Sequence, residues 1–248
     1  MIKFFRKIRQ KSLIENKFSK YLLYASGEII LVVIGILIAL QVNEWNEESK
    51  KEKISDSYII ALQSDLRADV ILLEDQIARF ANDMSNNLAL SKRLSSVTAD
   101  IDTIIEIARY EFLPYFDPSN ELNLSTFNAL IATGNLDLLD KGFVKKIQEH
   151  HAYQLTVLKG IDFNLEIAAN VGVEYSQSYP LNIATNAING QILNPFWEQI
   201  DHNKLIIDLN AAISSKIFGL QGVNYFRTIL LEKTKRLILE IDKIINEN

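Results

Sequence analysis

The chain has 248 residues, of which 48% are hydrophobic, and its formal net charge is −5. Cysteine is absent, which excludes a disulfide framework and any metal site built on thiolates. About 200 residues follow the apolar segment near the amino terminus, so we expect one domain of ordinary size there.

Residues 1–20 are a basic leader. They contain seven cationic side chains and one acidic side chain, whereas the rest of the chain has a formal charge of −11. Phenylalanines and isoleucines are interspersed among the cations, which is typical of an amphipathic helix on an anionic membrane surface. A nucleic-acid partner would not explain these apolar residues, so we expect none.

Residues 21–45 are predicted to form a single transmembrane helix. The 22 residues from Tyr21 to Val42 would make a helix roughly 33 Å long, which matches the hydrocarbon core of a bilayer. Tyr24 and Trp45 stand where interfacial aromatic side chains are expected. The alternatives are a buried helix of a globular protein and a cleavable signal peptide, but the run is long and no small-residue cleavage site follows it.

The distribution of charge predicts the orientation of this helix. Cations dominate the leader, while the charges that follow the span mix both signs, so the positive-inside rule puts the amino terminus in the cytoplasm. Residues 46–248 are then expected on the opposite side of the membrane.

Three residues of the span are candidates for helix packing in the bilayer. Gly35 and Ala39 form a small-xxx-small pair that allows close approach of two helices. Glu28 lies seven residues before Gly35, on nearly the same face, and an ionisable residue inside a membrane is a functional candidate. The alternative is that Glu28 lies at the cytoplasmic interface, where its carboxylate has no special role.

Residues 46–248 are predicted to form an all-α bundle of about three long helices and several short ones. Neither glycine nor proline occurs from Ile36 to Leu113, so we expect the transmembrane helix to continue without a break and to end near Ser95. Apolar residues recur at steps of three or four, as on a bundle or coiled-coil face. This stripe consists of Ile59, Leu62, Leu66, Val70, Leu73, Ile77, Phe80 and Met84.

Short elements are expected next. A helix over residues 100–110 is followed by a loop over residues 110–125 that contains two prolines and several aromatic residues. Ser125 is a candidate cap for a helix over residues 126–133, and Gly134 terminates that helix.

Two further long helices complete the predicted bundle. Asp140 is expected to cap a helix over residues 142–178, and residues 181–194 are expected to be irregular or briefly helical. Asn194 is expected to cap the last helix, with proline at its first position. Short connections predict alternating helix directions, with the last helix antiparallel to the first. The stripe of the helix over residues 142–178 is Val144, Ile147, Leu155, Leu158, Ile161, Leu165 and Ala168.

Two segments of the sequence resemble a known family. The opening carries a basic leader, Gly27-Glu28 at the start of the span and a Gln-x-Asn-x-Trp-Asn motif over residues 41–46, and TFNALIATGNLDLLD spans residues 126–140. Both resemble a domain-of-unknown-function family of single-pass membrane proteins common in flavobacteria and their relatives. The resemblance implies a membrane-anchored helical protein of unassigned activity. It supplies no catalytic residues. The charge distribution, read for a bacterial protein, predicts an inner-membrane anchor with residues 46–248 in the periplasm.

The sequence contains no recognisable catalytic motif. Adjacent His150 and His151 would point about 100° apart on a helix, which is unsuitable for chelating one metal ion. No nucleophile elbow, phosphate-binding loop or dinucleotide fingerprint occurs. We therefore expect no enzymatic activity, no cofactor and no metal site. The acidic residues of the first long helix are expected to form a solvated face: Glu48, Asp56, Asp65, Asp69, Glu74 and Asp75.

Eight aromatic residues flank the predicted chain reversals, and we expect them to meet at the membrane-distal end. One interpretation is a cap that closes the bundle core, and the other is a pocket or partner-binding patch. The eight are Tyr110, Phe112, Tyr115, Phe116, Tyr175, Tyr179, Phe196 and Trp197.

The expected function is that of a membrane-anchored interaction or scaffold protein, or of an accessory subunit of a membrane complex. Its partners would be the lipid bilayer and either another protein or further copies of the chain. The alternative is a periplasmic small-molecule sensing module, which would have to signal through a membrane partner because the leader is too short for an output domain.

Overall fold

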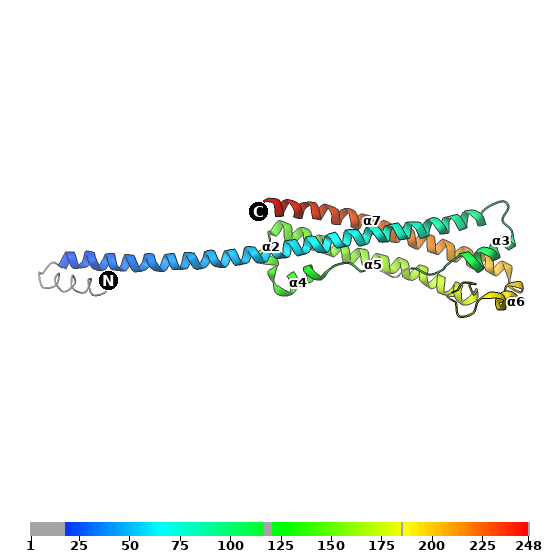
Figure 1. Ribbon diagram of the computed structural model, residues 1–248. Helices are drawn as coiled ribbons and strands as arrows, with labels where there is room; N and C mark the ends of the chain where they lie inside the picture. The colour runs from blue at the N-terminus through cyan, green and yellow to red at the C-terminus, as the bar shows by residue number, and fades with distance from the viewer. Residues whose placement is uncertain (1–17, 117–120, 185, 248) are drawn as a thin grey trace. The chain divides into compact units, whose positions relative to one another are not determined.

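The computed structural model describes residues 18–116, 121–184 and 186–247, and every regular element in these residues is a helix (Figure 1). The predicted all-α class is confirmed. The chain divides into two compact units, Met1–Asp56 (unit 1) and Ser57–Asn248 (unit 2), and helix α2 (Phe18–Leu94) contributes residues to both. Most of the predicted leader, residues 1–17, lies outside the described residues.

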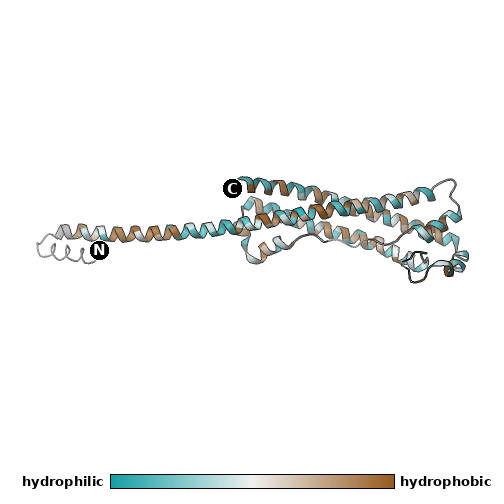
Figure 2. Ribbon diagram, in the orientation of Figure 1, coloured by the Kyte–Doolittle hydropathy of each residue, from teal (hydrophilic) through white to brown (hydrophobic). Residues whose placement is uncertain are grey.

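Unit 1 consists, in its described part, of the first half of α2. Every residue from Ser26 to Glu48 is exposed, and the apolar ones form a continuous run along the helix (Figure 2). This is the one helix in the described residues that is long and apolar enough to cross a membrane. The predicted end near Ser95 is confirmed, since α2 ends at Leu94.

Unit 2 is built on three long helices: the second half of α2, α5 (Lys141–Ser178) and α7 (His202–Glu247). Its core contains three clusters of buried apolar side chains. One cluster joins Leu62, Ile147 and Leu237, the next joins Leu73, Val157 and Leu230, and the third lies around Leu209 and Trp197. Residue numbers along these clusters increase on α2 and α5 and decrease on α7. Helices α2 and α5 therefore run parallel, and α7 runs antiparallel to both.

The predicted alternation of directions is wrong for α2 and α5, because residues 95–140 carry the chain back along the bundle. Helix α3 (Ile101–Glu106) and the π-helix η1 (Ile107–Glu111) follow α2. Residues 112–116 and 121–124 have no regular structure and precede α4 (Ser125–Thr133) and the 3₁₀ helix η2 (Asn135–Leu138). Ile107 lies in the same cluster as Trp197, whereas Phe127 of α4 lies with Leu62 at the other end.

We call residues 95–140 the return segment. A buried lysine binds this segment at Leu113. Lys216 Nζ of α7 donates to the Leu113 carbonyl oxygen (2.7 Å) and forms an ion pair with Asp83 of α2 (3.0 Å). The segment also passes close to Gly172 of α5, where an added Cβ would lie 2.5 Å from the Pro114 carbonyl oxygen. The return segment thus contacts both α5 and α7.

Ser125 and Asn194 are the first residues of α4 and α6 and not their predicted caps, whereas Asp140 has its predicted role. Asp140 accepts a hydrogen bond from the Phe143 amide (2.9 Å), as expected of the cap of α5. Ser125 does not cap α4; its place is taken by a carboxylate of α2, Asp65, as described below.

The predicted final helix is interrupted. Helix α6 (Asn194–Glu198) is preceded by the 3₁₀ helix η3 (Gly190–Leu193) and has its proline in the first turn. Helix α7 begins separately, because Asp201 Oδ1 accepts hydrogen bonds from the amides of Asn203 (2.9 Å) and Lys204 (3.1 Å). The carboxylate satisfies amide groups that a continuous helix would have bonded internally.

Candidate functional site

The three candidate packing residues of the span lie on the exposed part of α2. Glu28, Gly35 and Ala39 are all exposed, and a Cβ added at Gly35 would have no neighbour within 4 Å. Spacings of seven and four residues put the three on one side of the helix. The helix therefore presents a face with a carboxylate at one end and small residues further along.

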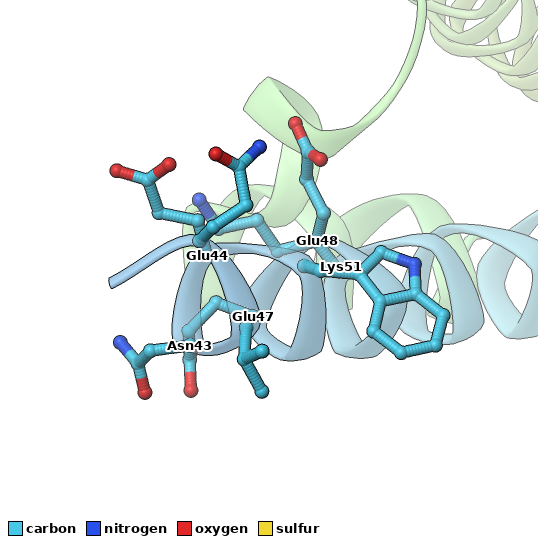
Figure 3. A pocket seen from close by; sticks show the side chains of 8 residues that line it. Asn43, Glu44, Glu47, Glu48 and Lys51 are labelled. Atoms are coloured by element: carbon cyan, nitrogen blue, oxygen red, sulfur yellow. The ribbon is translucent and has the colours of Figure 1, made fainter. Parts of the chain in front are cut away.

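A shallow hollow follows the apolar run of α2. Its lining comes from one helix, and Figure 3 shows the labelled side chains of Asn43, Glu44, Glu48 and Lys51 spread around that helix rather than converging on a point. Lys50 donates to Glu47 Oε1 (2.9 Å), and this hydrogen bond lowers the pKa of Glu47. The hollow is an open, charged part of the surface of one helix and not an enclosed site.

Four of the eight predicted aromatic residues are buried together in unit 2. Phe112 and Tyr175 meet edge to face with ring centroids 5.2 Å apart, and Tyr175 and Tyr179 lie 5.0 Å apart. Trp197 belongs to the same cluster and is 3% exposed. The Tyr179 hydroxyl donates to Asp208 Oδ2 (2.7 Å), and burial together with this bond raises the pKa of Tyr179.

The other four aromatic residues are arranged differently. Tyr110, Tyr115 and Phe196 are about half exposed, and Phe116 packs against the neighbouring cluster around Leu73. Phe196 touches Trp197 edge to face (5.6 Å), and the Arg109 guanidinium lies over the Tyr110 ring at 5.0 Å. The structure therefore brings the buried rings and their partly exposed neighbours to one end of unit 2, with Phe116 set apart.

The sequence interpretation missed a polar cluster inside unit 2. Asp69, expected on a solvated face, is fully buried. Its Oδ1 accepts from the backbone amide (2.8 Å) and the side-chain amide (2.9 Å) of Asn123, and its Oδ2 accepts from Gln154 Nε2 (3.0 Å). Burial raises the pKa of Asp69, although the hydrogen bonds from Asn123 oppose the shift.

Asp65 extends this cluster by one helical turn. Its Oδ2 accepts from the Thr126 amide (3.1 Å) and the Ser125 hydroxyl (3.2 Å), so a side chain of α2 satisfies the first turn of α4. Asp65 and Asp69 together fasten the end of the return segment to α2.

A cavity of about 20 Å³ lies next to these carboxylates. Its polar lining includes Asp65, Asn123, Gln154 and both adjacent histidines, and its remaining lining is apolar. The His151 ring stacks on Phe127 with centroids 4.2 Å apart, while His150 points toward Thr234 of α7, with Nε2 3.5 Å from Oγ1. The two histidines thus contact different elements, in agreement with their adjacent positions on α5.

The buried positions of α2 and α5 differ from the predicted stripes. On α5, Leu155 is 41% exposed, while His150 and Gln154 are buried. On α2, Asp69 and Gln76 are buried, and both follow Leu62 at seven-residue intervals. This heptad spacing was a signal in the sequence, but polar residues at those positions do not register in a search for apolar periodicity.

The fold and site define an all-α protein in which one long helix joins an exposed apolar segment to a helical unit with a buried carboxylate cluster. Residues 28–158 match a family of unknown function (DUF6090), and the chain belongs to that family. The match begins at Glu28 and includes Asp65, Asp69 and Gln154. No curated protein and no solved structure matches the chain.

Proposed function

We propose that the protein is a single-pass membrane-anchored scaffold that holds a helical interaction unit at a membrane surface and performs no catalysis. One observation carries the proposal. From Ser26 to Val42 the side chains of α2 are exposed on all faces and nearly all are apolar, whereas unit 2 has its own buried core. A helix that is apolar on every face requires an apolar environment, and a bilayer provides it for a run of this length.

The charge distribution supports a cytoplasmic amino terminus and a periplasmic unit 2, in the inner membrane of a bacterium. Seven cations precede the span within twenty residues, and the segment after it mixes Glu44, Glu47 and Glu48 with Lys50 and Lys51. Cations before a span hold that end in the cytoplasm during insertion.

The face that carries Glu28, Gly35 and Ala39 is the proposed contact with a partner in the bilayer, either a second copy or another membrane protein. Small residues allow two helix backbones to approach, and an ionisable residue at the edge of the apolar run is a functional candidate. The proposed role is therefore assembly within the membrane, with unit 2 displayed outside it.

The sensing alternative is less well supported. It depends on a small-molecule pocket among the distal aromatic residues, but Phe112, Tyr175, Tyr179 and Trp197 pack into a common core cluster. Their arrangement favours a cap that closes the core.

Two measurements test the proposal. A reporter fused after residue 248 is expected to be active in the periplasm, and a cytoplasmic carboxyl terminus would overturn the topology. Crosslinking of the full chain in native membranes is expected to give a defined oligomer or complex that is lost in the Gly35→Ile and Glu28→Gln variants. The control is Leu37→Ile, which lies about 200° around the helix from Gly35. Assembly that is equally insensitive to all three changes would reduce α2 to a simple tether.

A further inference from the structure

His150 is common to the linings of two cavities of unit 2. It lines the interior cavity beside Asp65 and Gln154, and it also lines a surface groove of about 340 Å³ between α5 and α7. Leu237 is the other residue common to both linings. The imidazole is 8% exposed. A change in its position would therefore join the interior cavity to the surface.

We call the interface between α5 and α7 around Thr234 the seam, and in the structure it is closed. The hydrogen bonds of Thr234 indicate which nitrogen of the neutral His150 imidazole carries the proton. Thr234 Oγ1 donates to the Leu230 carbonyl oxygen (2.9 Å), so toward His150 the hydroxyl oxygen acts as an acceptor. The neutral imidazole then carries its proton on Nε2 and donates it to Thr234. A second proton would have to be added at Nδ1.

The groups that face His150 make a positive charge there unfavourable. Among the charged groups around His150, Lys233 of α7 has the largest effect on its pKa. The Lys233 Nζ lies over the Tyr153 ring, 4.7 Å from the ring centroid. His151 adds a further positive charge when it is protonated, and Lys146 and Arg236 line the same groove.

The carboxylates near His150 are already engaged with other groups. Glu240 pairs with Lys146 (2.8 Å), and Glu149 lies 3.8 Å from Lys145. On the interior side, Asp65 accepts hydrogen bonds from the start of α4. Burial, followed by the charges of Lys233 and His151, lowers the pKa of His150 from 6.5 to about 4.

We propose that His150 is an acid-sensitive latch, and that protonation of its imidazole opens the seam between α5 and α7 around Thr234 and joins the interior cavity to the surface groove. Above pH 6.5 the imidazole is neutral in the closed and open forms, and the seam is closed. As the pH falls from 6.5 toward 4, only the open form binds the proton, so opening becomes about tenfold easier per pH unit. Below about pH 4 the effect levels off.

Hydrogen–deuterium exchange of the full chain in detergent micelles tests this proposal. Peptides covering residues 147–157 and 230–238 are compared with those of His150→Gln, which can still donate to Thr234 but does not titrate. Because wild type and variant are compared at the same pH, the intrinsic pH dependence of exchange cancels. At pH 4.5 these peptides are expected to open about 100-fold more often in the wild type than in the variant, and equally at pH 7.5.

Three controls keep the outcome decisive. His202→Gln removes an exposed histidine and is expected to behave as wild type. The seam near Gly160 and Gly222 provides a reference region without a histidine. Equal acid opening in wild type and His150→Gln would overturn the proposal, and so would abolition of the effect by His151→Gln alone. If His150→Gln does not fold, an NMR titration of the wild-type imidazole decides, and a His150 pKa near 6.5 would contradict the latch.

Discussion

The two halves of α2 use apolar residues in opposite ways. In unit 1 the run from Leu22 to Val42 exposes its large side chains on every face, while in unit 2 the helix buries side chains at intervals of three, four or seven, such as Ile59, Leu66 and Leu73. A continuous apolar surface suits a lipid environment, and a periodic stripe suits contact with two other helices. Within one helix, the spacing of apolar residues therefore distinguishes two kinds of partner, although each half alone would be called hydrophobic.

The same truncation in the two halves of the molecule should give the largest contrast. Leu73, in the second half of α2, is 1% exposed and packs in the cluster with Val157 and Leu220, so Leu73→Ala is expected to lower the free energy of unfolding of unit 2 by about 3–5 kcal/mol. Leu37 is 58% exposed, and Leu37→Ala is expected to change that free energy by less than about 0.5 kcal/mol. Denaturant unfolding of the full chain in detergent, followed by circular dichroism, measures both. A comparable loss in the two variants would contradict the division of α2 into a lipid-facing and a core-forming half.

Part of this architecture was accessible from the sequence. The end of α2 was predicted because polar residues interrupt its stripe near Ser95, and the start of α5 because Asp140 is a strong capping residue. Both signals are local, because each lies among the residues that form the helix end it predicts.

Other features depend on residues far apart in the chain. The parallel arrangement of α2 and α5 follows from a return segment held by Lys216, which donates to Leu113, 103 residues away in the sequence, and by Asp69, which accepts from Asn123. Asp69 looks solvated in a helical pattern because its partners Asn123 and Gln154 are 54 and 85 residues away. Such long-range polar pairs leave no periodic signal.

The second half of α2 allows a further comparison, between a buried carboxylate and an exposed one. Replacing Asp69 by Leu would leave three donors of Asn123 and Gln154 without their acceptor, and we expect a loss of about 2–3 kcal/mol. Asp69→Asn is expected to be milder, because one amide oxygen can still accept from Asn123 and the amide of Gln154 can rotate. Asp75→Leu is the matched control, since that carboxylate is 61% exposed and pairs with Arg79 on the surface.

The pH dependence of these variants separates hydrogen bonding from charge. Because burial raises the pKa of Asp69 above 3.8, the folded state binds this proton at higher pH than the unfolded state does. The ionised carboxyl therefore disfavours folding at neutral pH, and this penalty is relieved as the pH falls through the folded pKa toward 3.8. The relief is expected in wild type and to be absent in Asp69→Asn. An identical acid profile in the two proteins would indicate that Asp69 titrates normally.

The smallest predicted difference in stability is between alanine substitutions at Gly172 in unit 2 and at Gly27 in unit 1. A Cβ added at Gly172 would lie 2.5 Å from the Pro114 carbonyl oxygen, so Gly172→Ala must displace the backbone of the return segment. Overpacking of this kind costs about 1–3 kcal/mol, and the better helix propensity of alanine offsets about 1 kcal/mol of it, which leaves a net loss of at most about 2 kcal/mol. At Gly27 an added Cβ would meet nothing within 4 Å, so Gly27→Ala should not destabilise unit 2. Thermal unfolding of the two variants side by side measures the difference. If Gly172→Ala were as stable as wild type, the return segment would have to shift freely, and the close contact between Pro114 and α5 would not be what holds the parallel arrangement of α2 and α5.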